Sequence, residues 1–358
     1  GSPSVPNSSA TTGATHPPVS AESGKLSILE WGGYEAAGTK AQTYGLVGGT
    51  NYTDKYGANG ISYTYIDNDD QALEKATSDG AFDLMHPCSE NLKDYVDRGL
   101  IQPFDTGLLS SFGELNPHLV EAGQIDGQQY LIPWDWGYGS LMYRSDKVDE
   151  ADATGWELAW NPKYSGKISL WNGGSTNFEI AGLQLSFPNI DDPTTDEIEQ
   201  AKQKLIEQKP LNKRYWDSEY GQMRPDFKSG TTWISYSWQA AYAFFQDKGL
   251  AVKYLEPSQG RLAWLCGFTL GANTKNYHHV HDYVESFINK KASEDLINLY
   301  YYGASNTAVD LNKIQNQTLV DSLQLDNVDA IAGDDVHLQG YMPNKDAIDL
   351  AWQEVKAS

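Results

Sequence analysis

The stretch from Leu131 to Arg144 constrains the fold of this chain more than any other. After its proline it is apolar, aromatic and rich in residues that favour strands. We interpret it as a crossover strand that leaves one domain, passes the cleft between domains and enters the next. Such clefts are common binding places for small ligands. The alternative is a buried core strand in which Trp134 and Trp136 pack and Asp135 caps a turn.

Strands and helices are predicted to alternate on both sides of this stretch, which indicates α/β domains with mainly parallel sheets. The other strands are predicted at 25–31, 60–66, 82–86, 167–171, 231–238, 251–255 and 261–270. The helices are predicted at 69–78, 91–99, 178–185, 194–208, 239–247, 277–289, 293–301 and 346–355. Because 358 residues exceed what one ordinary core supports, we expect two domains.

Residues 1–25 differ in composition from the rest of the chain. They are Ser, Thr, Pro, Gly and Ala with almost no large apolar side chain, so they cannot bury enough surface to fold alone. We expect a disordered tether of the kind that separates an exported domain from a signal peptide or lipid anchor. This predicts a location in the periplasm, or anchorage by lipid to the outer face of the cytoplasmic membrane.

Charge and cysteine content exclude several classes of function. With 26 Lys and Arg against 48 Asp and Glu, the formal net charge is −22, which repels nucleic acid. The acidity fits a cationic ligand and equally fits a soluble, salt-tolerant surface. The sequence contains no run of about 18 apolar residues, the length that a membrane-spanning helix needs. Cys88 and Cys266 lack metal-binding spacing, and form either one disulfide or two free thiols.

The sequence lacks the signatures of common enzymes. It contains no HExxH, no GxSxG and no complete phosphate loop. His278, His279 and His281 could hold a metal, but we interpret them as the solvated face of a helix. The acidic run 67–70 is interpreted as a turn and helix cap instead of a calcium loop. We therefore expect no catalysis, no cofactor and no metal.

Tryptophans recur at or just beyond the predicted strand ends. In open α/β sheets, ligands bind outside the carboxyl ends of the strands, so these side chains could converge on one cleft. Each of them taken alone is also compatible with core packing. They are Trp31, Trp134, Trp136, Trp171, Trp238 and Trp264.

Taken together, the motifs resemble the bacterial periplasmic polyamine-binding family of ABC-transporter solute-binding proteins. The likeness covers nearly everything after the tether. It rests on the order and spacing of Trp31-x-x-Tyr34, Phe82-Asp83-Leu84 with Pro87, Gly99 to Pro103, Ile132-Pro133 with Trp136-Gly137, Trp160 with Pro162-Lys163-Tyr164, Trp238, Trp264 and Tyr302-Gly303. The resemblance implies a two-lobed periplasmic-binding-protein fold of type II, whose lobes close on ligand around crossover strands.

The family resemblance also assigns parts of the chain. It implies one lobe of 26–134 plus 266–315 and another of 135–265 plus 316–358. Cys88 and Cys266 would both lie in the first lobe beside the hinge, so it further implies a disulfide between them in an exported protein. Trp31, Tyr34, Trp238 and Trp264 match cleft aromatics of the family. The implied partner is an ABC permease of the inner membrane, and the implied protein is a monomer.

The chain departs from the family where acids are expected to grip amines. Asn172, Gly173 and Thr176 follow the strand that ends at Trp171, and Cys266 stands two residues after Trp264. We therefore expect an onium compound, such as a betaine, choline, carnitine or dimethylsulfoniopropionate, because its cationic centre gains from ring faces without needing N–H acceptors. The expected ring faces are those of Trp31, Trp171, Trp238 and Trp264.

Polar groups complete the expected site. Asp135 is expected to face the cation, while Ser89 and the helix start after Gly174 would receive a zwitterion's carboxylate. The second hypothesis is a polyamine, with Glu35, Glu90 and Asp135 replacing the missing acids. A sugar-binding protein and an enzyme acting on a cationic substrate remain further alternatives.

Overall fold

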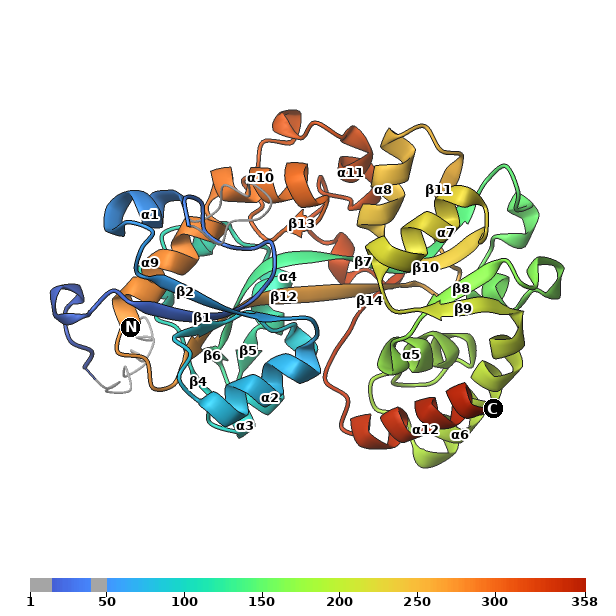
Figure 1. Ribbon diagram of the computed structural model, residues 1–358, viewed down its shortest axis with the longest axis horizontal. Helices are drawn as coiled ribbons and strands as arrows, with labels where there is room; N and C mark the ends of the chain where they lie inside the picture. Colours follow the sequence, from blue (N-terminus) through green and yellow to red (C-terminus); the bar gives the residue numbers. More distant parts are fainter. Residues whose placement is uncertain (1–14, 40–49) are drawn as a thin grey trace, which may run out of the picture.

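The computed structural model describes residues 15–39 and 50–358 as two lobes that share one continuous sheet (Figure 1). Across this sheet the strand order is β2-β1-β3-β12-β7-β10-β8-β9. The ribbon shows β7 and β12 running through the middle of the molecule, from the lobe that carries β1 and β2 to the lobe that carries β8 and β9. The two-lobed fold expected from the sequence is confirmed.

In the first lobe the strands pair mainly in parallel. β1 (Leu26–Trp31) lies between β2 (Ile61–Ile66) and β3 (Leu84–Met85), and both neighbours run parallel to it. Burial of Leu26, Ile28 and Leu29 ties β1 to the core. The helices of this lobe are α1 (Thr50–Tyr56), α2 (Asp69–Asp79), α3 (Leu92–Asp97), α4 (Pro117–Ala122), α9 (Tyr277–Ile288), α10 (Lys290–Tyr300) and α11 (Gln317–Ser322).

The second lobe repeats the parallel arrangement. β8 (Ile168–Trp171) runs parallel to both β9 (Asn212–Trp216) and β10 (Ile234–Trp238), while β10 pairs antiparallel with the crossover strand β7. Its helices are α5 (Gly174–Gln184), α6 (Thr195–Gln208), α7 (Arg224–Ser229), α8 (Gln239–Asp247) and α12 (Lys345–Ala357). The capping box of Thr194 and Glu197 begins α6, as its sequence predicts.

The crossover strands form the hinge. β7 (Leu131–Arg144) and β12 (Arg261–Gly271) pair antiparallel, with one irregularity between Cys266 and Gly267. A third segment crosses beside them, because β14 (Val336–Leu338) pairs with β12 before the chain reaches α12. The short strands are β4 (Ile101–Gln102), β5 (Gln124–Ile125), β6 (Gln128–Gln129), β11 (Val252–Tyr254) and β13 (Gly303–Ala304).

The cores of the two lobes meet close to the hinge. One core combines buried residues from 26–138 with others from 263–331, and a second draws on 141–262. Leu319, Leu323 and Ile331 pack in the first of these cores. The chain therefore leaves the first lobe only after β14, whereas the resemblance implied a limit at 315–316.

The described part of the expected tether packs against α9. Residues 1–14 lie outside the described residues, but Glu22 accepts hydrogen bonds from the backbone N–H groups of His278 and His279 at the start of α9. Its carboxylate also contacts the Nδ1 atoms of both rings. His279 and His281 are buried, so the interpretation of these histidines as a solvated face is wrong. The reason is that 15–25 and Asp105 cover this side of α9.

Cys88 and Cys266 form a disulfide, which confirms the pairing that the resemblance implied. It joins the residue that follows β3 and His86 to the hinge strand β12, across a sequence separation of 178 residues. In the described part of the chain, no helix is long and apolar enough to cross a bilayer.

Removing this bond should destabilise the protein measurably. The double variant Cys88→Ser/Cys266→Ser should lose about 2–5 kcal/mol of unfolding free energy, because the unfolded chain regains the freedom of a long loop. Urea unfolding of the variant and of reduced wild type should agree. Alkylation of two thiols in unreduced, denatured wild type would show that the bond is absent.

Candidate functional site

A buried line of charged groups lies where strands β1 and β7 reach the hinge. Nδ1 of His86 is 2.6 Å from Oε1 of Glu30, and Nε2 of His86 is 2.7 Å from Oδ1 of Asp135. The exposed fractions of Glu30, His86 and Asp135 are 0%, 1% and 3%. Tyr34 donates a hydrogen bond to Oδ2 of Asp135 at 3.2 Å. Four side chains from three separate segments therefore form one buried network.

The ionisation of this network follows from its neighbours. Burial alone would lower the pKa of His86, but the carboxylates of Glu30 and Asp135 raise it to about 10. Burial raises the pKa of Glu30, although the His86 charge opposes this shift. With His86 protonated, both ring nitrogens donate to carboxylates. Tyr34 thus lies beside a buried imidazole ring that is held between two carboxyl groups.

Aromatic rings surround Tyr34 on the first lobe. Its ring centroid lies 5.4 Å from that of Trp134 and 5.2 Å from that of Tyr300. Tyr300 donates a hydrogen bond to the carbonyl of Gly33, which fixes the turn that follows β1. Trp31, at the end of β1, donates from Nε1 to the carbonyl of His86 at 2.9 Å and stays partly exposed. Trp31 and Tyr34 therefore lie on the same segment as Glu30, the first member of the charged line formed by Glu30, His86 and Asp135.

At the hinge, Trp264 is half-buried and meets Tyr302 edge to face, with 5.1 Å between ring centroids. Its buried Nε1 has no hydrogen-bond partner among the described residues. Gly137 on β7 permits this approach, since a Cβ there would lie 2.9 Å from Nε1 of Trp264. Burial raises the pKa of Tyr302, and the charges of Glu219 and Tyr220 in the second lobe and of Asp135 add to this rise. Trp264 and Tyr302 therefore connect the charged line to the facing lobe.

On the second lobe, Trp171 ends β8 and Trp238 ends β10. Their ring centroids are 5.3 Å apart and the planes meet at 65°, so they form an edge-to-face pair. Both are partly exposed, while Trp216 packs under them and is buried. The ends of two neighbouring parallel strands thus present partly exposed tryptophans, as the sequence predicts.

Two predicted tryptophans lie elsewhere. Trp134 is 0% exposed, stacks on Phe268 and meets Phe287 edge to face, so it belongs to the core beneath Tyr34. Trp136 is 5% exposed and donates from Nε1 to the carbonyl of Ala304 at 3.0 Å. For these two side chains the alternative of core packing describes the structure. Asp135 caps no turn and bonds His86 and Tyr34 instead.

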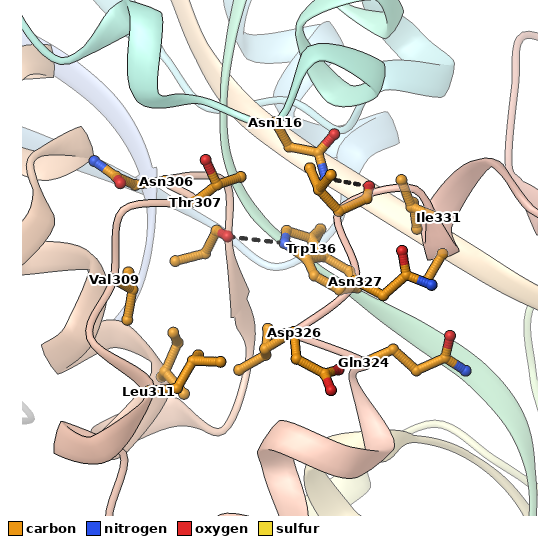
Figure 2. Close-up of a pocket in the computed structure, with 15 residues that line it drawn as sticks. Asn116, Trp136, Asn306, Thr307, Val309, Leu311, Gln324, Asp326, Asn327 and Ile331 are labelled. Carbon is orange, nitrogen blue, oxygen red and sulfur yellow. Dashed lines mark hydrogen bonds between the residues drawn. The ribbon is translucent and has the colours of Figure 1, made fainter.

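Trp136 lines a separate cavity of about 220 Å³ (Figure 2). Asn116 and Asn327 lie on its walls, and Asn116 donates to the carbonyl of Val328 at 3.0 Å. The walls come from β7, β13 and the segment that follows α11. Its lining includes none of Tyr34, Trp264, Tyr300 and Tyr302, so this cavity is distinct from the site built around those rings.

The remaining predicted polar residues are spread over the first lobe. Ser89 and Glu90 follow the disulfide and are partly buried. Burial, with Asp69 and Asp191 nearby, raises the pKa of Glu90 to about 8. Glu35 is buried beside Tyr65. Among the described residues, no group of three or more His, Cys, Asp or Glu side chains is arranged to hold a metal ion.

Sequence reasoning missed Glu30 and His86. The available signal was a charged residue, Glu30, inside the apolar strand 26–31, together with a histidine at the end of the strand predicted at 82–86. Neither position indicates its partner, because the three members of the line lie 56 and 49 residues apart.

Comparison with known proteins places the chain in a family. The family profile of bacterial extracellular solute-binding proteins matches residues 50–321. The chain belongs to this family. The spermidine/putrescine-binding periplasmic protein of Escherichia coli K12 is 27% identical over 227 residues, which cover 63% of this chain and 64% of that protein. The putrescine-binding periplasmic protein PotF of the same organism is 24% identical over 310 residues, covering 81% and 80%.

Solved structures agree with this placement at the level of the fold. The spermidine/putrescine substrate-binding protein PotD of Streptococcus pneumoniae superposes with a TM-score of 0.72 at 17% identity, covering 93% of this chain and 98% of that one. The Tp0655 lipoprotein of Treponema pallidum also gives 0.72, at 13% identity and 92% and 98% coverage. The resemblance predicted from the sequence is thus confirmed.

The charged line makes stability depend on pH. The folded pKa of His86, about 10, exceeds the ~6.5 of an unfolded histidine. Its stabilising contribution is therefore fully present below about pH 6.5 and is lost as the pH rises through about 10. Unfolding free energies should fall between about pH 7 and about pH 10. In Asp135→Asn the fall should end at a lower pH and be smaller, because one carboxylate no longer supports the imidazolium in the folded protein. An NMR titration that shows the His86 ring deprotonating near pH 7 in wild type would contradict this.

Proposed function

We propose that this protein is the extracytoplasmic solute-binding component of an ABC importer and captures a small organic polyamine-type cation between its lobes. It would deliver the ligand unchanged to an inner-membrane permease. The observation that carries the proposal is the buried pair of carboxyl groups of Glu30 and Asp135, which flank His86 next to the ring of Tyr34. Aromatic faces and a fixed negative charge together attract an amine cation.

The choice of an amine over an onium compound rests on acids that sequence reasoning did not count. The onium hypothesis followed from the missing carboxylates at Asn172, Gly173, Thr176 and Cys266. The fold supplies other buried carboxylates at the hinge, and an ammonium group with N–H donors gains more from them than a quaternary centre does. Relatives named for spermidine and putrescine support the same choice.

The onium class stays as a second candidate because of Trp171 and Trp238. This pair offers partly exposed ring faces, and the nearby Asn172 accepts a hydrogen bond from Trp352 instead of supplying a charge. Such a surface suits a cationic centre without N–H donors.

Contacts between the lobes support capture by closure. Lys345 at the start of α12 lies 3.5 Å from Asp70 at the start of α2, and Lys93 lies 5.7 Å from the ring centroid of Tyr341. These side chains are solvent-accessible, so each contact is worth little alone. A ligand that touches both lobes would shift the population toward the closed arrangement.

Calorimetric titration with spermidine, putrescine, choline and glycine betaine tests the proposal. Spermidine or putrescine should bind with a dissociation constant of roughly micromolar or lower, and the recovered ligand should be chemically unchanged. Trp264→Ala should weaken binding about tenfold through the lost ring face. The control Trp233→Phe, at a partly exposed tryptophan that faces Lys167, should bind like wild type. Tight choline or betaine binding with no response to either polyamine would refute the polyamine assignment.

A further inference from the structure

Helix α5 carries a fully buried carboxylate with one unused oxygen. Glu179 is 0% exposed, and its Oε2 accepts a hydrogen bond from Nε2 of Gln339 at 2.7 Å. Its Oε1 is buried and has no hydrogen-bond partner among the residues that the structure describes. Leaving a polar group unsatisfied in the interior costs about 1–3 kcal/mol, and more for a charged group. This position therefore lacks the partner that a purely structural carboxylate would have.

The surroundings of Glu179 are fixed by the hinge. Nε2 of Gln339 also donates to Oγ1 of Thr176 at 3.2 Å, and Thr176 lies one helical turn before Glu179 on the same face of α5. The backbone N–H of Gln339 donates to the carbonyl of Ala263, next to Trp264 on β12. Gln339 therefore holds one carboxylate oxygen of Glu179 in place while the second stays available.

The charge that acts most strongly on Glu179 comes from the other lobe. Burial, followed by the carboxylate of Glu90 and then that of Asp191, raises the pKa of Glu179 well above its usual range. Glu90 belongs to the first lobe and follows Cys88. The carboxylates of Glu179 and Glu90 thus come from different lobes, and they repel when both are ionised.

Within residues 15–39 and 50–358, no Lys or Arg side chain pairs with these two carboxylates to offset the repulsion. Neither Glu179 nor Glu90 forms an ion pair with a Lys or Arg side chain there. The charge of Lys345 opposes the rise in the pKa of Glu90. Its ammonium group, however, pairs with the carboxylates of Asp70 and Asp349. A cation supplied from outside would offset this repulsion.

We propose that Glu179, Thr176 and Gln339, with Glu90 of the facing lobe, form an ammonium subsite that receives one terminal ammonium group of the ligand. This inference rests on the proposed function and adds the residues that select a primary amine. An ammonium group has three N–H donors, which Oε1 of Glu179, the Thr176 hydroxyl and the Glu90 carboxylate can accept. An onium centre offers no such donors and leaves these acceptors unsatisfied.

The subsite should release protons when it is filled. A carboxyl group that is protonated in the free protein must ionise to pair with an ammonium ion, and its proton passes to the buffer. Titration of wild type with spermidine at pH 7 in two buffers of different ionisation enthalpy should therefore give different apparent enthalpies. Glu179→Gln should reduce this difference.

Affinity measurements on matched variants decide the assignment. Glu179→Gln should weaken spermidine binding about ten- to hundred-fold, because a charged hydrogen bond is lost. Any choline binding should stay unchanged, and the ligand-free variant should melt no lower than wild type. Glu294→Gln, a buried acid on α10, is the control and should keep wild-type affinity. Glu90→Gln, on the facing lobe, should reproduce the selective loss even if Glu179→Gln folds poorly.

Two results would reject the subsite but leave the proposed function standing, and a third would reject both. If wild type binds spermidine and both Glu179→Gln and Glu90→Gln bind it equally well, the subsite is wrong while the function stands. If Glu179→Gln lowers the melting temperature and weakens choline and spermidine alike, Glu179 is structural. If wild type binds no member of the panel, the proposed function fails and the subsite fails with it.

Discussion

The antiparallel pairing of β7 with β12 is the constraint on which the rest of the structure depends. It joins the two halves of the sheet and brings Asp135, Gly137 and Trp264 into one place. Every group at the hinge is positioned relative to these two strands: His86 through Asp135, Tyr302 through Trp264, and Gln339 through Ala263. Because backbone hydrogen bonds hold the two strands together, these groups are built on paired strands and not on loops.

A local irregularity of this pairing shapes the charged line. Cys266 pairs with Asp135, and the next residue, Gly267, pairs with Pro133, so Trp134 has no opposite partner. A bulge breaks the strict alternation of side chains along a strand. As a result Trp134 and Asp135, although consecutive, both contact His86. The same irregularity in register explains how a buried strand can place the carboxyl group of Asp135 next to the hydroxyl of Tyr34.

The sequence predicted the architecture better than it predicted the site. Alternating strands and helices give the two lobes because periodicity is local, and the aromatic ends of β8 and β10 follow from strand direction. The partners of His86 could not be predicted, since Glu30 and Asp135 meet it only through tertiary structure. The burial of Trp134 could not be told from strand alternation, because both faces of β7 are buried. Glu179 lies in a helix whose sequence does not indicate that its carboxylate is buried or that the charge of Glu90 acts on it.

The position of the disulfide has a consequence for the integrity of the chain. Cys88 precedes the crossover on β7 and Cys266 follows most of the second lobe, so the bond closes a loop that contains β8, β9, β10 and their helices. All elements of the second lobe except α12 thus lie between the two cysteines that the covalent bond joins. A protease that cuts one exposed turn between 145 and 260 would leave both fragments joined through sulfur. The oxidised protein can therefore carry such a break in the second lobe without losing either fragment.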